Sequence, residues 1–191
     1  RAVSFFYEGA SRLPKTLKDY KEFDEKSGEP NKEKLMALLS TSSRVYLFLS
    51  LLVVSIITTI GYLSLRNVMT MSDNESSLFI SFVFMIIISL VSIQNMKWTS
   101  FLIGIRKIAV LQRFNTIMNS LKILVFLAIL LIDPRVINFM VVLLVLALVN
   151  FFYFRSRVLQ WFKVNEIIRY PRFFDKAIFD SMWAATWRMG V

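Results

Sequence analysis

The chain has 191 residues, 56% of them hydrophobic, and it includes 18 Phe, which is more apolar than a water-soluble domain that must cover its own surface. The formal charge of +10 does not indicate a nucleic-acid partner, because the basic residues separate apolar runs of membrane-spanning length. Cysteine and histidine are absent, which excludes thiol nucleophiles, disulfides, imidazole bases and nearly all zinc sites. We therefore expect no enzyme, no metal site and no cofactor.

Residues 1–44 are predicted to form a cytoplasmic linker. Between residues 11 and 42 the charge alternates around Gly28, Glu29 and Pro30, a composition that suits a solvated loop with short amphipathic helices. The next 21 residues, 45–65, are uncharged, and about 20 residues are enough to cross a hydrocarbon core of roughly 30 Å. The first membrane span is therefore predicted at about 45–65, followed by a short polar stretch at 66–75.

Three further spans are predicted, at about 76–103, 109–132 and 136–154. The second continues past Lys97, with Trp98 expected at headgroup level. The third ends at Asp133-Pro134, because proline lacks an amide donor and disfavours helical geometry in the residue before it. The third and fourth spans are thus expected to form a tight hairpin, and residues 45–154 to form a four-helix transmembrane region.

Residues 155–191 are predicted to be cytoplasmic or interfacial. The stretch before Pro171 suits either a helix on the membrane surface or the solvated end of the fourth span, and residues 177–191 are apolar enough to begin a further helix. The expected fold class is all-α: a polytopic membrane protein with four transmembrane helices and cytoplasmic amphipathic segments.

The sidedness of Lys and Arg predicts the orientation. Residues 1–44, 97–122 and 155–188 contain 21 of the 23 basic residues, and the opposite loops contain only Arg66 and Arg135. Because cytoplasmic loops carry the excess of basic residues, we expect the basic segments inside and the 66–75 and 133–135 turns outside.

A polar stripe on the third span is the candidate substrate site. Gln112, Asn115, Asn119 and Lys122 are spaced by 3, 4 and 3, which puts them on one helix face. Lys122 lies ten residues before Ile132, about 15 Å along the axis and near mid-membrane. Ionisable residues at that depth usually face a bundle interior or a wet cavity, where a cation can hold an anionic headgroup such as a pyrophosphate. The alternative is that the helix sits deeper and Lys122 reaches the cytoplasmic interface.

Anionic membrane lipids are a second expected partner. Arg106, Lys107 and Arg113 could contact their headgroups at the inner leaflet, although the orientation rule alone explains these cations. No Asp or Glu falls within a predicted span, so this stretch offers no carboxylate for a proton relay or a sodium site.

Four passages together resemble one transporter family. They are the opening RAVSFFYEG at 1–9, WTSFLIGIRKIAVLQR at 98–113, the hairpin at Asp133-Pro134 and the closing WAATWRMG at 183–190. Their order resembles that of the polysaccharide and O-antigen repeat-unit flippases of the multidrug/oligosaccharidyl-lipid/polysaccharide exporter superfamily. Asp133-Pro134-Arg135 stands where relatives often have a glycine-rich turn, so the glycan is not indicated.

This resemblance implies an internal fragment of a larger transporter bundle, corresponding to spans three to six. It implies alternating-access transport of an undecaprenyl-diphosphate-linked oligosaccharide across the bacterial inner membrane for polysaccharide biosynthesis. The partners would be that lipid-linked oligosaccharide and the remaining helices of the transporter. The opening Arg1, in place of Met, also leads us to expect a fragment.

Two other classes of function compete with the flippase. A polyprenyl or acyl transferase would need an aspartate-rich metal motif or a histidine at the membrane face, and the chain has neither. A small four-helix membrane sensor or assembly protein without transport activity remains the alternative, with the charged linker as its docking surface.

Overall fold

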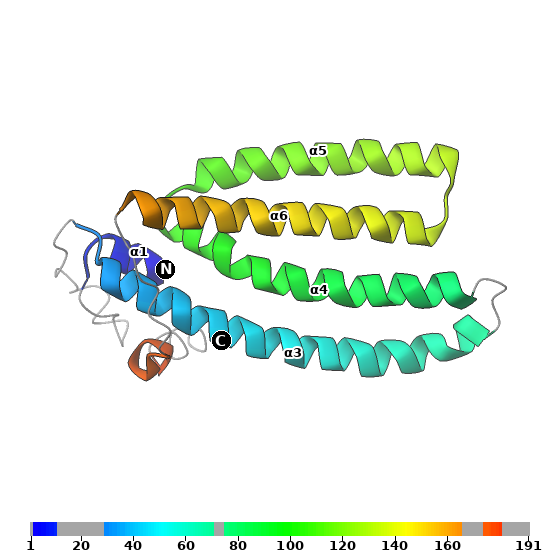
Figure 1. Ribbon diagram of the computed structural model, residues 1–191, viewed down its shortest axis with the longest axis horizontal. Helices are drawn as coiled ribbons and strands as arrows, with labels where there is room; N and C mark the ends of the chain where they lie inside the picture. Colours follow the sequence, from blue (N-terminus) through cyan, green and yellow to red (C-terminus); the bar gives the residue numbers. More distant parts are fainter. Residues whose placement is uncertain (1, 11–28, 71–74, 166–173, 181–191) are drawn as a thin grey trace, which may run out of the picture.

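The chain folds as a group of long antiparallel helices. The computed structural model describes residues 2–10, 29–70, 75–165 and 174–180, and within these ranges it contains helices and no strand. The helices are α1 (Ala2–Tyr7), α3 (Lys32–Thr70), α4 (Glu75–Gly104), α5 (Ile108–Ile132) and α6 (Val136–Val164), shown in Figure 1. Among the described residues, α3, α4, α5 and α6 are long and apolar enough to cross a membrane. The predicted all-α class with four transmembrane helices is confirmed.

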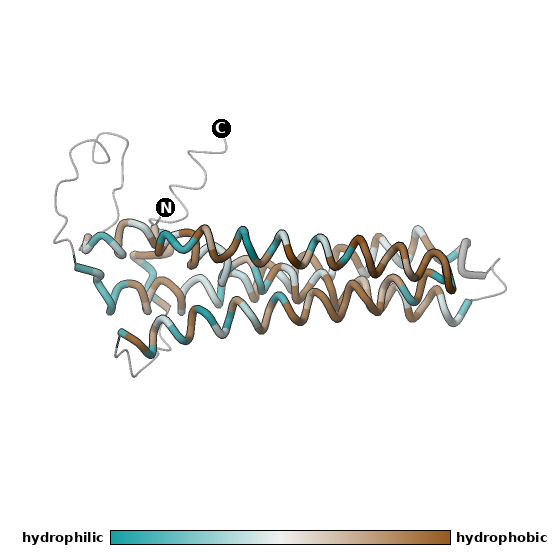
Figure 2. Tube along the Cα trace, turned by 90° about the horizontal axis from the view of Figure 1, so that it is seen from above, coloured by the Kyte–Doolittle hydropathy of each residue, from teal (hydrophilic) through white to brown (hydrophobic). Residues whose placement is uncertain are grey.

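The four long helices lie side by side in the order α5, α6, α4, α3 (Figure 1). The middle helix α4 packs against both α6 and α3, whereas α5 makes less extensive contacts, with α6 and with α4. One end of the bundle carries α1, the α4–α5 connection and the end of α6, and we call it the basic end. Figure 2 shows that hydrophobic residues dominate the helices away from this end. The apolar stretches of the four helices therefore lie beside one another, as helices that cross the same membrane must.

Two helices are longer than the predicted spans. Helix α3 begins at Lys32, so residues 32–44, predicted as part of a linker, continue the first span as helix. Asn31 determines this start, because its Oδ1 accepts a hydrogen bond from the Lys34 amide at 3.1 Å and so satisfies an otherwise unpaired donor. Helix α6 runs on to Val164, so residues 155–164 continue the fourth span as one helix and do not form a separate surface helix.

Helix α3 also ends at Thr70 and not at the predicted residue 65, whereas other predicted boundaries agree closely with the structure. Helix α4 covers the predicted 76–103 span, and α5 and α6 are joined by the short 133–135 turn that the sequence predicts. The further helix predicted from residue 177 is described only as far as residue 180, where residues 176–180 are helical. Its remainder lies outside the described residues.

The buried core is at the basic end and not between the spans. Phe101 is 1% exposed and packs against the rings of Trp161 and Phe162, with centroid distances of 5.7 and 5.2 Å. The other buried hydrophobic residues of this basic-end core come from the five helices, the residues that follow α1 and α4, and the 174–180 segment: Phe6, Ala10, Leu35, Leu38, Leu39, Trp98, Leu102, Ile105, Leu111, Phe154, Val158 and Ile178. Along the spans, by contrast, large apolar side chains such as Leu131 are exposed. Lipid tails solvate such side chains as well as a protein interior does.

A tight connection joins α4 to α5. The Arg106 amide donates to the Ile103 carbonyl and the Lys107 amide donates to the Leu102 carbonyl, which is the hydrogen-bond pattern of a Schellman motif. Arg106 occupies the left-handed position of this motif, with φ of 61°. Glycine usually takes that position, but here Gly104 lies two residues earlier and serves the packing of α1.

Helix α1 lies against the end of α4. A side chain at Gly104 would collide with the side chain of Val3, and its Cβ would lie 3.3 Å from the Ser4 amide nitrogen. The Ser4 hydroxyl donates to the Gly104 carbonyl at 3.3 Å, and Glu8 forms an ion pair with Arg106. The α4–α5 connection is thus held from both sides, by the basic-end core and by α1.

Candidate functional site

The predicted polar stripe lies along α5, close to its contact with α6. Asn115 and Lys122 are partly buried, whereas Gln112 and Asn119 are exposed. Within the described residues, no side-chain hydrogen bond joins the four, and the Gln112 carbonyl accepts a bond from the Thr116 hydroxyl at 2.9 Å. The structure therefore shows four separate polar side chains along α5, two of which are partly buried.

Lys122 occupies the middle of an apolar helix. Its Nζ lies 5.5 Å from the centroid of the Phe126 ring, and Phe126 in turn packs edge-to-face on Phe139 of α6 at 5.3 Å. A cation over an aromatic face is attracted by the ring quadrupole, but this attraction is weaker than pairing with an anion. No carboxylate in the described part of the chain forms an ion pair with Lys122. Its charge is available to an anionic group.

The three predicted headgroup contacts differ from one another. Arg106 forms an ion pair with Glu8, so part of its charge is already balanced within the chain. Lys107 is the residue directly before α5, and both it and Arg113 are exposed. Lys107 and Arg113 are therefore the two of this set best placed to meet a membrane surface.

A polar network between α3 and α4 includes Lys97, which the sequence pattern predicted only as part of the membrane topology. Lys97 Nζ donates to Ser43 Oγ and to Gln94 Oε1, each at 3.0 Å, and Gln94 Nε2 donates to Ser50 Oγ, also at 3.0 Å. Ser50 is buried, and Lys97 also lies 5.0 Å from the centre of the Trp98 ring. The signal for this network was available: Gln94 and Lys97 are three residues apart, and Ser43 and Ser50 are seven apart, so each pair shares a helix face.

Three asparagine side chains of the long helices and Trp98 differ in whether they form hydrogen bonds. Asn138 Nδ2 donates to the Asp133 carbonyl at 3.1 Å and so supports the turn before α6. The Oδ1 atoms of Asn95 and Asn150 and the Nε1 atom of Trp98 are buried and have no hydrogen-bond partner in the structure. Trp98 is itself buried in the basic-end core, and its expected position at headgroup level stays a prediction.

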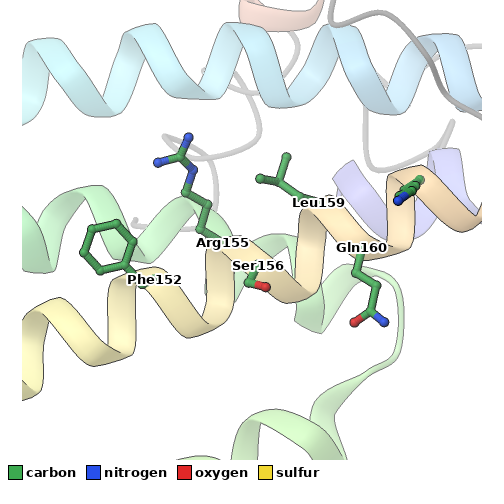
Figure 3. A pocket seen from close by; sticks show the side chains of 6 residues that line it. Phe152, Arg155, Ser156, Leu159 and Gln160 are labelled. Carbon is green, nitrogen blue, oxygen red and sulfur yellow. The ribbon is translucent and has the colours of Figure 1, made fainter.

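An open groove of about 580 Å³ lies along the basic end of α6. Its lining residues are all on this one helix: Phe152, Arg155, Ser156, Leu159, Gln160 and Lys163. In Figure 3, Arg155 and Leu159 project to one side of α6, toward α3, whereas Ser156 and Gln160 project to the other. The sequence contains the corresponding signal, because 155, 159 and 163 are spaced by four and share a face.

The chemistry available in these sites is the binding of anions. Among the described residues, no group of three or more Asp, Glu, His or Cys side chains could hold a metal ion. The polar groups near the basic end include lysine and arginine side chains with hydroxyls and amides, which are hydrogen-bond donors to phosphate or carboxylate oxygens.

No protein-family model, no curated protein and no solved structure matches this chain. The resemblance to the flippase family therefore stays a prediction. The four long apolar helices are compatible with a multi-pass membrane protein.

Proposed function

We propose that the chain is part of a transporter that flips an undecaprenyl-diphosphate-linked oligosaccharide across the bacterial inner membrane by alternating access. The observation that carries the proposal is Lys122, a partly buried cation without a carboxylate partner among the described residues, in the middle of α5. A charge at that depth is costly and is retained where it serves a ligand pathway or a counter-ion. In this proposal Lys122 is one of several contacts to the diphosphate.

The packing of the spans supports a larger assembly. Few side chains of α3, α4, α5 and α6 are buried within their apolar stretches, and the firm packing is at the basic end. Further helices packed on these faces would complete a cavity beside α5, and a rocking motion could then use the basic-end core as a rigid unit. The basic end faces the cytoplasm in this proposal, following the excess of Lys and Arg there.

An export assay with Lys122 variants tests the proposal. In the intact protein, Lys122→Ala should reduce surface display of the glycan roughly tenfold, because one charge-assisted contact to a phosphate contributes about 1.5–3 kcal/mol. Lys122→Arg keeps the charge and should retain most of the export, and both variants should reach the membrane at equal levels by immunoblot. Normal export by Lys122→Ala would contradict the proposed role of Lys122.

The alternative function is a small membrane sensor or assembly protein. The observation in its favour is that the basic-end core joins α1, the start of α3 and the end of α6 into one packed unit with a charged surface. The two functions differ in what the intact gene encodes. The flippase proposal expects two spans before Arg1 and six or more after Val191, whereas a reading frame limited to these 191 residues would favour the sensor or assembly protein.

A further inference from the structure

The groove on α6 has the polarity profile of a site at a membrane surface. Phe152 lies at its apolar end, and Lys163 lies eleven residues further along, about 16 Å toward the basic end. Between them are Arg155 and Leu159, so cationic and apolar side chains alternate along one face. A molecule that fills such a groove would have both an anionic group and an apolar portion.

The charges at this groove are not balanced by the described part of the chain. Arg155 is close enough to Lys97 of α4 for the two like charges to repel each other. No carboxylate among the described residues forms an ion pair with Arg155, Lys97 or Lys163. Like charges brought together near a low-dielectric slab favour the binding of an anion.

The hydrogen-bond donors of the groove suit a phosphate. Arg155 offers a planar fork of N–H groups, which matches phosphate oxygens in a bidentate manner. Ser156 and Gln160 project to the other side of α6 (Figure 3), so Arg155 is the phosphate donor on the face that carries Leu159.

We propose that this groove binds the phosphate-bearing headgroup of an anionic phospholipid at the basic end of the bundle, with an acyl chain along Phe152 and Leu159. The apolar lining favours a lipid over a free phosphate ion, because a free ion would gain nothing from Phe152 or Leu159. The site differs from the polar stripe on α5 and from Arg106, Lys107 and Arg113. It also stands independently of the proposed transport function.

Lipid binding to the purified chain tests this site directly. The full chain in detergent is titrated with phosphatidylglycerol and, separately, with phosphatidylcholine, and the lipid-bound fraction is measured by native mass spectrometry. We expect phosphatidylglycerol to bind more tightly, and the double variant Arg155→Gln/Lys163→Gln to weaken its binding roughly thirtyfold, while phosphatidylcholine binding changes little.

A matched control separates a built site from general charge attraction. Lys32→Gln/Lys176→Gln removes two lysine charges from exposed positions near the same end of the bundle. It should leave phosphatidylglycerol binding within about threefold of the parent. Equal loss in the two double variants would overturn the proposal, as would equal affinity of the parent for the two lipids.

A further variant and a competition arm complete the test. Leu159→Glu keeps both cations and places a carboxylate between them, so it should weaken phosphatidylglycerol binding at least tenfold by repulsion. Helix content measured by circular dichroism should be unchanged, because Arg155, Leu159 and Lys163 are all exposed. If Leu159→Glu binds like the parent, or if millimolar inorganic phosphate displaces the lipid, the groove is not a phospholipid site.

Discussion

Gly104 is the residue that allows α1 to lie against α4. A Cβ at this position would collide with Val3, so Gly104→Ala should force α1 away from the basic-end core. Ala10, which follows α1, is fully buried, and the chain has no cysteine of its own. In an Ala10→Cys background, we expect Gly104→Ala to raise the rate of maleimide labelling on the order of tenfold, through more frequent local opening.

The control for this experiment is Ser100→Ala. Ser100 is an exposed residue of the same helix, so its replacement should leave the labelling rate of Cys at position 10 unchanged. If Gly104→Ala also leaves that rate unchanged, α1 does not depend on the close approach seen at Gly104.

A second prediction at the scale of single residues concerns pH. Side-chain hydrogen bonds from Arg135 hold the pKa of Asp133 below its usual range. Because the folded pKa is lowered, the ionised Asp133 stabilises the 133–135 turn above the ordinary pKa of aspartate, and this contribution is lost as the pH falls through the lower folded pKa. Arg135→Gln should raise the pKa of Asp133 toward its usual value.

This pKa is measured by NMR titration of the Asp133 carboxyl carbon in detergent micelles. Arg66→Gln removes the other basic residue of the predicted outer loops and is the control, since it should leave the titration unchanged. An Asp133 pKa that stays the same in Arg135→Gln would mean that the hydrogen bonds are not maintained in solution.

At the scale of helices, α3 and α4 contact each other in two ways. In the apolar stretch, Gly61 allows the ring of Phe82 to approach, because a Cβ at Gly61 would lie 2.8 Å from that ring. Nearer the basic end, Gln94 Nε2 donates to Ser50 Oγ. We expect a coupling free energy of about 0.6 kcal/mol between Ser50→Ala and Gln94→Leu, the average found for hydrogen bonds between membrane helices.

The coupling is obtained from a double-mutant cycle on unfolding in mixed micelles. Thr59 is the control position, because its hydroxyl donates to the Ser55 carbonyl within α3 and makes no bond to α4. Thr59→Ala combined with Gln94→Leu should therefore be additive. Additivity of Ser50→Ala with Gln94→Leu would show that the observed bond does not stabilise the α3–α4 contact.

For the molecule as a whole, the sequence predicts the spans well. A segment embedded in lipid must form its backbone hydrogen bonds within itself, and long uncharged runs are therefore helical. The start of α3 was missed and the end of α6 was left open between two alternatives, since Asn31 and the basic-end core extend the two helices beyond the predicted spans. The docking of α1 and the bond from the Asp175 amide to Thr41 Oγ1 join distant segments and leave no local signal. The polar stripe was found by its spacing, whereas Lys97 was interpreted only as part of the topology.

The orientation of the whole bundle is the last prediction. Helix α5 separates Lys107 at the basic end from the 133–135 turn, so single cysteines at positions 107 and 135 should lie on opposite sides of the membrane. A membrane-impermeant maleimide applied to intact cells with a permeable outer envelope should label Arg135→Cys and spare Lys107→Cys, and inverted vesicles should show the reverse. The cysteine-free parent provides the background. Labelling of both positions from one side would mean that α5 does not cross the membrane, and the mid-membrane position of Lys122 would then be wrong as well.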